Sequence, residues 1–212
     1  MTPAALARRA FLLSSAAALS GCSALSALSG ATAELDVYEL RAPAGGPVAA
    51  RPLDRHLIVE VPTTAGALDT DRIMIRPNAL QAQYLPDARW GEPVPVMVQT
   101  LMLRSFENTQ GLRYVGRRPV GPGGDYALIT EISDFQAEVA GEGASIRLRL
   151  TARLVREADA RIVASRTFSA GAEAAGTDTI VVVEAFDRAV AGLMRDVTGW
   201  VMALLGVRLG NA

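Results

Sequence analysis

Apolar and polar residues alternate most regularly between residues 146 and 155. The apolar positions are Ile146, Leu148, Leu150, Ala152 and Leu154, and the positions between them are Arg147, Arg149, Thr151, Arg153 and Val155. Successive side chains of a β-strand point to opposite faces, so this segment is predicted to be a strand that buries its apolar row. Its arginine-bearing face is predicted to point outward.

Two neighbouring segments, 126–139 and 161–172, show the same alternation. In the first, the apolar positions change parity near Ser133-Asp134, which predicts a β-bulge. The apolar positions of the second are Ile162, Ala164, Phe168 and Ala170. Short turn sequences at 141–143 and 158–159 separate the three segments, so an antiparallel meander is predicted.

Two other segments repeat apolar residues at three- and four-residue steps, which predicts amphipathic helices. The first begins at Glu92-Pro93, where proline suits a first turn, and ends near Asn108. Its stripe consists of Val94, Met97, Val98, Leu101, Met102 and Phe106. The second begins at Thr177-Asp178-Thr179, and any of these three residues can cap it. Its stripe consists of Phe186, Ala189, Val190, Leu193, Met194, Val197, Val201 and Leu204. For the first stripe, which holds Met97 and Met102, core packing is favoured over a lipid-binding surface.

The first half of the domain is predicted to be mostly strand. The strand segments are 35–40, 56–62, 71–76, 79–85 and 113–116, with a hairpin turn at Pro77-Asn78 and a loop over 43–52. Along the whole domain, the predicted elements follow the order strands, helix, strands, helix. The predicted fold is α+β, a largely antiparallel sheet with two helices packed on one face, in a domain over residues 35–212.

The N-terminus has the parts of a lipoprotein signal peptide. Arg8 and Arg9 precede the apolar stretch 10–19, which is too short for a membrane span of about 20 residues. The run Leu19-Ser20-Gly21-Cys22 then resembles a lipobox, at which the cysteine is acylated and becomes the new N-terminus. We therefore predict a signal peptide over residues 1–21, lipidation at Cys22 and a lipidated flexible tether over 22–34.

Alternative interpretations of this region remain. Cys22 could be an ordinary small buried residue, and a cut after Ala31-Thr32-Ala33 would release an unanchored protein. Lipidation is favoured because the second cut would lie far from the apolar stretch. The paired arginines resemble a twin-arginine export signal, but the flanking hydroxyl residue and lysine are missing, which favours the general secretory route.

Composition excludes several functions. Removal of residues 1–21 takes away two of the 21 basic residues and none of the 22 acidic ones, which leaves a formal charge of −3 and no indication of nucleic-acid binding. Cys22 is the only cysteine and His56 the only histidine. The sequence contains no GxSxG, P-loop, HExxH or GxGxxG signature, and Gly121-Pro122-Gly123-Gly124 is interpreted as a turn. We predict no cofactor, no metal site and no enzymatic activity.

Several motifs together resemble the ABC-type transport auxiliary lipoproteins. They are Tyr38 and Leu40, Ile73-Met74-Ile75-Arg76, Leu80 to Tyr84, Arg89-Trp90-Gly91-Glu92-Pro93, Tyr126-Ala127-Leu128 and Ile132 to Ala137. Each motif is loose, but their order, combined with the lipobox, is specific. The resemblance covers nearly all of residues 35–206.

This resemblance implies a periplasm-facing lipoprotein that works with an MCE-domain protein and the ABC permease and ATPase of a lipid transporter. Related lipoproteins of the Pqi type assemble into homo-oligomeric rings. Ser23 stands where many lipoproteins retained in the inner membrane have aspartate, which favours the outer membrane. An independent lipid carrier is the alternative, and it needs an apolar cavity between sheet and helices. An exported hydrolase is disfavoured because no nucleophile and base are paired.

Five residues are candidates for partner contact. Tyr84 and Trp90 either contact a partner or, as we favour, pack the hairpin against the first helix. Arg147, Arg149 and Arg153 either form a solvated face or meet acidic groups of a partner or lipid headgroups, and the sequence does not separate these alternatives.

Overall fold

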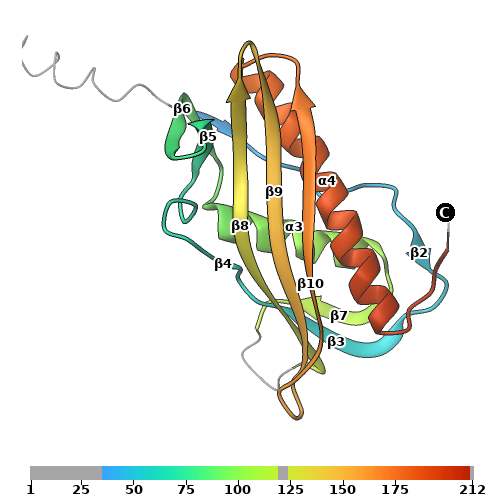
Figure 1. Ribbon diagram of the computed structural model, residues 1–212. Helices are drawn as coiled ribbons and strands as arrows, with labels where there is room; N and C mark the ends of the chain where they lie inside the picture. Colours follow the sequence, from blue (N-terminus) through green and yellow to red (C-terminus); the bar gives the residue numbers. More distant parts are fainter. Residues whose placement is uncertain (1–34, 119–123, 211–212) are drawn as a thin grey trace, which may run out of the picture. The chain divides into compact units, whose positions relative to one another are not determined.

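The computed structural model describes residues 35–118 and 124–210 (Figure 1). The predicted signal peptide, Cys22 and the tether lie outside the described residues. The helices are α3 (Val94–Asn108) and α4 (Thr179–Leu204). The strands are β1 (Asp36–Tyr38), β2 (Val48–Ala49), β3 (Leu53–Val59), β4 (Thr63–Thr64), β5 (Arg72–Asn78), β6 (Gln81–Trp90), β7 (Leu112–Gly116), β8 (Tyr126–Ala140), β9 (Gly143–Arg156), β10 (Arg161–Ala174) and β11 (Leu209–Gly210).

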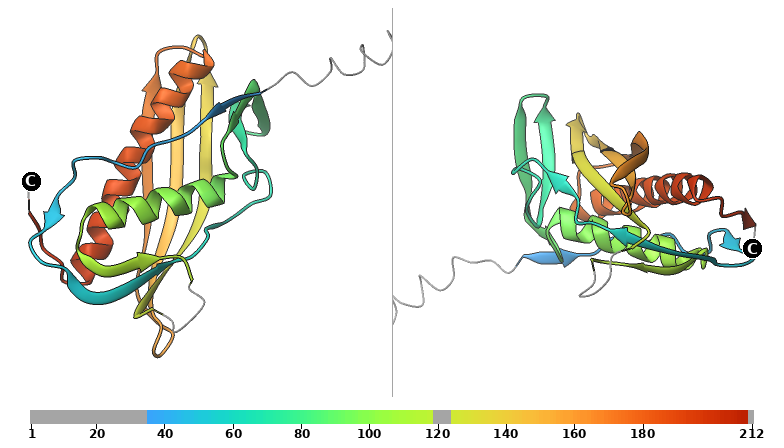
Figure 2. Two further views of the ribbon diagram at one scale, coloured as in Figure 1. Left: turned by 180° about the vertical axis from the view of Figure 1, so that it is seen from behind. Right: turned by 90° about the horizontal axis from the view of Figure 1, so that it is seen from below.

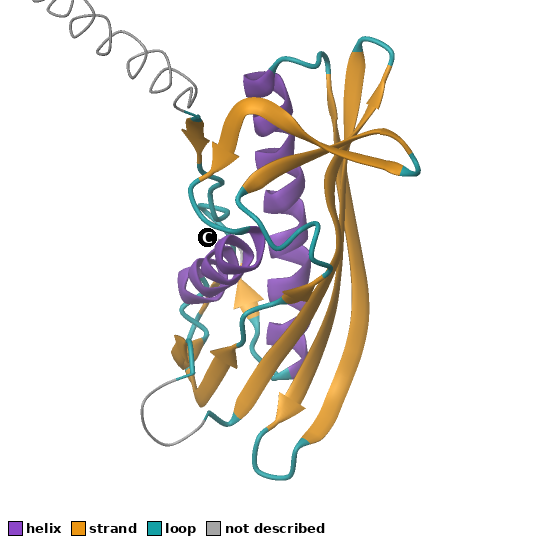
Figure 3. Cartoon of the chain, turned by 90° about the vertical axis from the view of Figure 1, so that its left-hand side faces the viewer, coloured by secondary structure: helices purple, strands orange, loops and turns teal. Residues whose placement is uncertain are grey.

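Both helices lie on the same side of the main sheet (Figures 2 and 3). Helix α4 packs along β9 and β10, whereas α3 crosses α4 and contacts β3 and β7. The apolar rows of the three long strands and the stripes of the two helices therefore bury one another in a single core. This arrangement confirms the predicted α+β fold with two helices on one face of the sheet.

Strand β8 organises the main sheet because it pairs along both edges. One edge pairs antiparallel with β9, which in turn pairs antiparallel with β10. The other edge pairs in parallel with β3, β4 and β5 in succession, near residues 126–128, 131–132 and 137–138. The antiparallel hairpin β5–β6 and the parallel pairs β1–β6 and β3–β7 complete a mixed sheet in which the long pairings are antiparallel.

The predicted bulge in β8 is confirmed. The register with β9 shifts between Ile132 and Asp134, so one extra residue separates the two parts of the strand. Ile132 and Phe135 are consequently both buried although their numbers differ in parity. The bulge keeps a single apolar face along the whole strand.

A second bulge corrects the prediction for β10. The register shifts between Ile162 and Ala164, so Ile162 pairs with Val155 while Ala164 pairs with Leu154. Ile162 thus lies on the outer face with 56% of its surface exposed, and its assignment to the buried row was wrong. The extra residue is Val163, which the alternation did not reveal because isoleucine and valine fit either parity.

The helix predictions are confirmed, with two differences at the ends of α4. Every predicted stripe position of both helices is buried except Leu204, which is 39% exposed in the last turn. Asp178 occupies the N-cap of α4 but makes no side-chain capping hydrogen bond. Pro93 precedes α3 and Pro95 lies in its first turn, as expected.

The first half departs more from the predictions. The hairpin turn falls at Ala79-Leu80, where the N–H of Leu80 donates to the Asn78 side chain at 3.1 Å, and not at Pro77-Asn78. The loop predicted over 43–52 contains β2, which pairs with β11 at the other end of the domain. Neither β2 nor β4 has a local signal, because each consists of two residues held by distant segments.

Candidate partner-binding surface

Strand β9 carries a row of three arginines, Arg147, Arg149 and Arg153, on the face of the sheet opposite the helices. We call them the arginine row. Along β9, the buried residues Leu148 and Leu150 are 0% and 1% exposed, and the intervening Arg147 and Arg149 are exposed. Arg153 lies further along the same face and is half-buried. The predicted alternation is therefore present, and it places all three guanidinium groups on one open surface, which we call the outer face.

Acidic residues of β8 flank the arginine row on one side. Arg147 forms an ion pair with Glu138 at 3.2 Å, and Arg153 forms one with Glu131 at 3.7 Å. These four side chains remain roughly 40–55% exposed, so each pair contributes only about 0–1 kcal/mol to folding. Part of the positive charge is thus neutralised within the chain itself.

Arg149 differs from its two neighbours. It stands opposite Asp134 in the β8–β9 register, yet it forms no salt bridge with any residue that the structure describes. The hydroxyl of Ser133, in the bulge, donates to the Arg149 backbone carbonyl at 3.5 Å. Arg149 is therefore the arginine of the row best placed to receive an external acidic group.

Small residues of β10 flank the row on the other side. Arg147 is opposite Gly171, Arg149 is opposite Ser169, and Arg153 is opposite Ser165. A shallow hollow of about 280 Å³ results around Ser169 and Gly171. Charge on the outer face is therefore layered, with acidic residues on β8, arginines on β9 and small uncharged side chains on β10.

The two aromatic candidates occupy different environments. Trp90 is 0% exposed and makes edge-to-face contacts with Phe135 and Phe186, with ring centroids 6.3 and 5.3 Å apart. Tyr84 is 38% exposed, and its hydroxyl donates to the Ala67 carbonyl at 3.0 Å. Trp90 thus packs in the core, where it has no surface to offer a partner, whereas Tyr84 keeps one.

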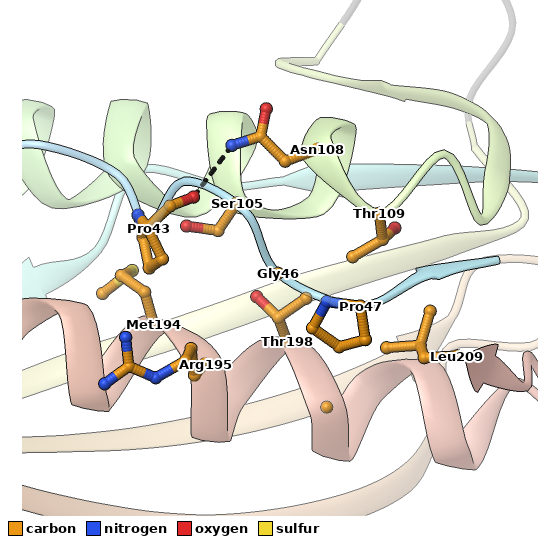
Figure 4. A pocket seen from close by; sticks show the side chains of 11 residues that line it. Pro43, Gly46, Pro47, Ser105, Asn108, Thr109, Met194, Arg195, Thr198 and Leu209 are labelled. Carbon is orange, nitrogen blue, oxygen red and sulfur yellow. Dashed lines mark hydrogen bonds between the residues drawn. The ribbon is translucent and has the colours of Figure 1, made fainter. Parts of the chain in front are cut away.

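A pocket that the sequence did not predict lies between the two helices (Figure 4). It holds about 140 Å³, and Met194 and Thr198 of α4 face Ser105 of α3 across it. Pro43 and Pro47 close one side, where the amide of Asn108 donates to the Pro43 carbonyl at 3.1 Å. Its walls come from four distant segments, so no local motif could have indicated it.

Two further arginines, Arg41 and Arg118, form ion pairs that connect segments far apart in the chain. Asp187 of α4 accepts from the Arg41 guanidinium at 2.6 Å and raises the pKa of Arg41 by hydrogen bonding and by its charge. Glu60 and Glu157 raise the pKa of Arg118 in the same way. Both arginines stay charged at physiological pH, so neither guanidinium group acts as a pH switch.

The described residues contain no group of three or more His, Cys, Asp or Glu side chains that could hold a metal ion. Across the same ranges, no helix is both long and apolar enough to cross a bilayer. His56 is exposed on β3, where its ring contacts Tyr114 with centroids 5.6 Å apart.

Known proteins resemble this chain in sequence and in fold. An uncharacterized protein of Bradyrhizobium diazoefficiens is 30% identical over 172 residues, which are 81% of this chain and 46% of that protein. This chain thus spans less than half the length of that relative. A crystal structure from Xanthomonas campestris superposes with a TM-score of 0.74 and 28% identity, covering 81% of this chain and 97% of that one. Another, of an uncharacterized protein, shares the fold with a TM-score of 0.61 and 13% identity, covering 80% of this chain and 99% of that one.

The family is defined over most of the domain. Residues 38–198 match the ABC-type transport auxiliary lipoprotein component, and this chain belongs to that family. The resemblance seen in the order of the sequence motifs is thereby confirmed. Membership assigns the protein to the auxiliary lipoproteins of ABC-type transport.

Proposed function

We propose that this protein is a non-catalytic, periplasm-facing subunit of an MCE/ABC-type intermembrane lipid transport system, in which it scaffolds or tethers the transporter and supports envelope integrity. Membership of the transport auxiliary family carries the proposal. The open outer face with its arginine row supports a role in binding a protein partner. The partners would be the MCE-domain protein and its ABC permease and ATPase, with assembly of the lipoprotein into a homo-oligomeric ring.

The membrane attachment in this proposal depends on Cys22. Acyl chains contribute about 0.8 kcal/mol per buried CH₂, and two or more chains give stable anchoring. The lipid would hold the domain at the cell envelope, in the outer membrane according to the residue that follows Cys22.

An independent lipid carrier has less support. The pocket between α3 and α4 holds about 140 Å³, whereas small-molecule sites hold roughly 300–1,000 Å³. The buried apolar residues of sheet and helices instead contact one another in one continuous core. An acyl chain would have to open that core before it could bind.

Affinity capture tests the proposed function directly. Full-length lipoprotein extracted in mild detergent should recover an MCE-domain protein and an ABC permease. The variant with Arg147→Glu, Arg149→Glu and Arg153→Glu should recover at least ten-fold less, because like charges facing each other across an interface cost several kcal/mol.

A matched variant controls for net charge. Arg51, Arg104 and Arg208 are exposed and lie off the outer face, so their joint replacement by glutamate changes the charge equally and should leave capture intact. Equal loss in both variants would remove the arginine row from the interface. Failure of the wild-type protein to recover any transporter component would overturn the proposed function.

Replacement of the lipidation site tests the anchor. Cys22→Ala should abolish incorporation of radiolabelled fatty acid and release the protein from the membrane fraction, because the acyl chains supply the anchoring free energy. Ser23→Ala serves as the neighbouring control and should be labelled like the wild type. Equal labelling of Cys22→Ala and wild type would contradict the lipoprotein anchor.

A further inference from the structure

Strand β10 forms a free edge of the main sheet. It pairs with β9 along one side over Arg161–Ala174, and no strand in the described ranges pairs with its other side. An unpaired edge presents a row of backbone donors and acceptors that can pair with another chain. A strand of 14 residues offers a long row.

One hydrogen bond identifies which backbone groups point outward. The Glu173 carbonyl accepts from the Arg188 guanidinium of α4 at 2.9 Å, so this carbonyl points away from β9. Alternate residues of an antiparallel strand share their direction, so Thr167, Ser169 and Gly171 also direct their N–H and C=O groups outward. No described group bonds to these outward groups.

The edge has few of the features by which proteins protect such strands. It contains no proline and no lysine, and Arg166 is the one charged residue between Ile162 and Ala172. Its bulge lies at one end, at Val163, and leaves residues 164–173 regular. Natural edges are usually blocked by such devices. Between Arg166 and Glu173, six consecutive residues carry none of them, which leaves this part of the edge open to pairing.

The outer face beside this edge suits acidic side chains. A strand added to β10 would lie about 10 Å from β9, because neighbouring strands are about 4.8 Å apart. The β10 residues that lie between are small, so a β9 guanidinium can extend over them toward an added strand, although Arg147 and Arg153 would have to leave their β8 partners to do so. Arg149, which is opposite Ser169, has no ion pair among the described residues that would hold it back.

The inner side of the same edge is mostly apolar, and its charged residue, Arg166, lies with its guanidinium over the Phe168 ring. Helix α4 passes behind β10, and its C-terminal end lies beyond the edge (Figure 1). Trp200, in that part of α4, is half-buried and makes an edge-to-face contact with Phe168, with centroids 5.5 Å apart. Leu204 is 39% exposed one turn later. Apolar side chains of an added strand would cover these residues.

We propose that the edge of β10 binds an extended segment of a partner protein as an added strand, and that this segment alternates acidic and apolar residues. The acidic residues would face Arg147, Arg149 and Arg153, and the apolar residues would pack against Trp200 of α4. The proposal goes beyond the proposed function because it specifies the chemistry of the bound segment. The binding site would be the same whichever protein of the cell envelope carries that segment.

A labelled peptide tests the proposal. The probe is a fluorescent ten-residue peptide that alternates valine and glutamate, titrated by anisotropy with the full-length lipoprotein in neutral detergent micelles at low salt. The lysine counterpart of the peptide should bind at least ten-fold more weakly, because it would face the arginines with like charge. A glutamate peptide N-methylated at alternate amides should also lose at least ten-fold, because it cannot pair with the edge.

A pair of substitutions repeats the test from the protein side. Ser169→Pro removes an outward N–H without touching the ladder to β9, since proline is tolerated where the N–H of an edge strand faces solvent. This variant should bind the peptide at least ten-fold more weakly, and Ser169→Ala should bind it normally. The N-methylated peptide with wild-type protein keeps the test decisive if Ser169→Pro unfolds.

Several outcomes would overturn the proposal. They are absence of peptide binding, equal binding of the glutamate and lysine peptides, and unchanged binding after N-methylation. A wild-type dimer that Ser169→Pro dissociates would show that a second copy occupies the edge instead. Because capture of the transporter is measured separately, failure of the peptide would leave the proposed function standing, and failure of capture would leave the edge site standing.

Discussion

The inner and outer faces of β8, β9 and β10 are built from the same three strands but serve different purposes. The inner face consists mainly of leucine, isoleucine, phenylalanine and alanine side chains that pack against α4, with Thr130 and Arg166 as its polar members. The outer face carries exposed arginines, acidic residues and hydroxyls whose ion pairs are half-solvated. A single alternating pattern can therefore bury the side chains that stabilise the fold on one face and leave the other face exposed to bind a partner.

The two bulges preserve this division. Strands of 14 and 15 residues accumulate twist, and an extra residue in β8 and in β10 locally resets the parity. Without the bulge at Ser133, Phe135 and Ala137 would point to the outer face. The two β-bulges are therefore as important as the alternation in keeping apolar side chains on the inner face.

The largest expected effect comes from breaking the inner face. Leu148→Ala should lower the free energy of unfolding by about 2–5 kcal/mol, because it removes buried methyl groups and leaves a cavity. The adjacent Arg149→Ala is the matched control on the outer face and should change it by less than about 0.5 kcal/mol. Urea unfolding followed by circular dichroism measures both. Similar losses for the two variants would show that the faces do not differ as described.

A smaller effect is expected at Gly171, where β10 lies against the backbone of β9. A Cβ added at Gly171 would lie 2.7 Å from the Ile146 carbonyl oxygen, so Gly171→Ala must shift the backbone and should destabilise the domain by about 1–3 kcal/mol. The same substitution at Gly192, inside α4, meets nothing within 4 Å and should stabilise it by about 0.5–1 kcal/mol. Thermal unfolding distinguishes the opposite signs, and a stabilised Gly171→Ala would contradict the close approach.

The smallest effect concerns the outer face itself. A double-mutant cycle with Arg147→Ala and Glu138→Ala should give a coupling of about 0.2–1 kcal/mol, decreasing with added salt, because both groups are half-exposed. The measurement is urea unfolding of the two single variants and the double variant. A coupling above 2 kcal/mol that salt does not change would mean that the outer face contributes to stability like the core.

The candidate surface was only partly predictable. The arginine row could be read directly because alternation fixes which residues share a face. The ion pairs with Glu138 and Glu131 could not, because they depend on the register between strands. For the aromatic pair, only the fold shows that Trp90 lies among Phe135 and Phe186 while Tyr84 stays exposed. The free edge of β10 likewise follows from strand order.

By itself, the sequence determined the elements whose signal is local. Period-two alternation specified the long strands, the three- and four-residue steps specified α3 and α4, and the order of motifs specified the family. Only the tertiary structure decided the parallel pairings of β8, the joining of β2 to β11, and the placement of Ile162 on the outer face. The physical reason is that periodicity reports which face of an element is buried, whereas strand neighbours and short paired segments depend on contacts between residues far apart in the chain.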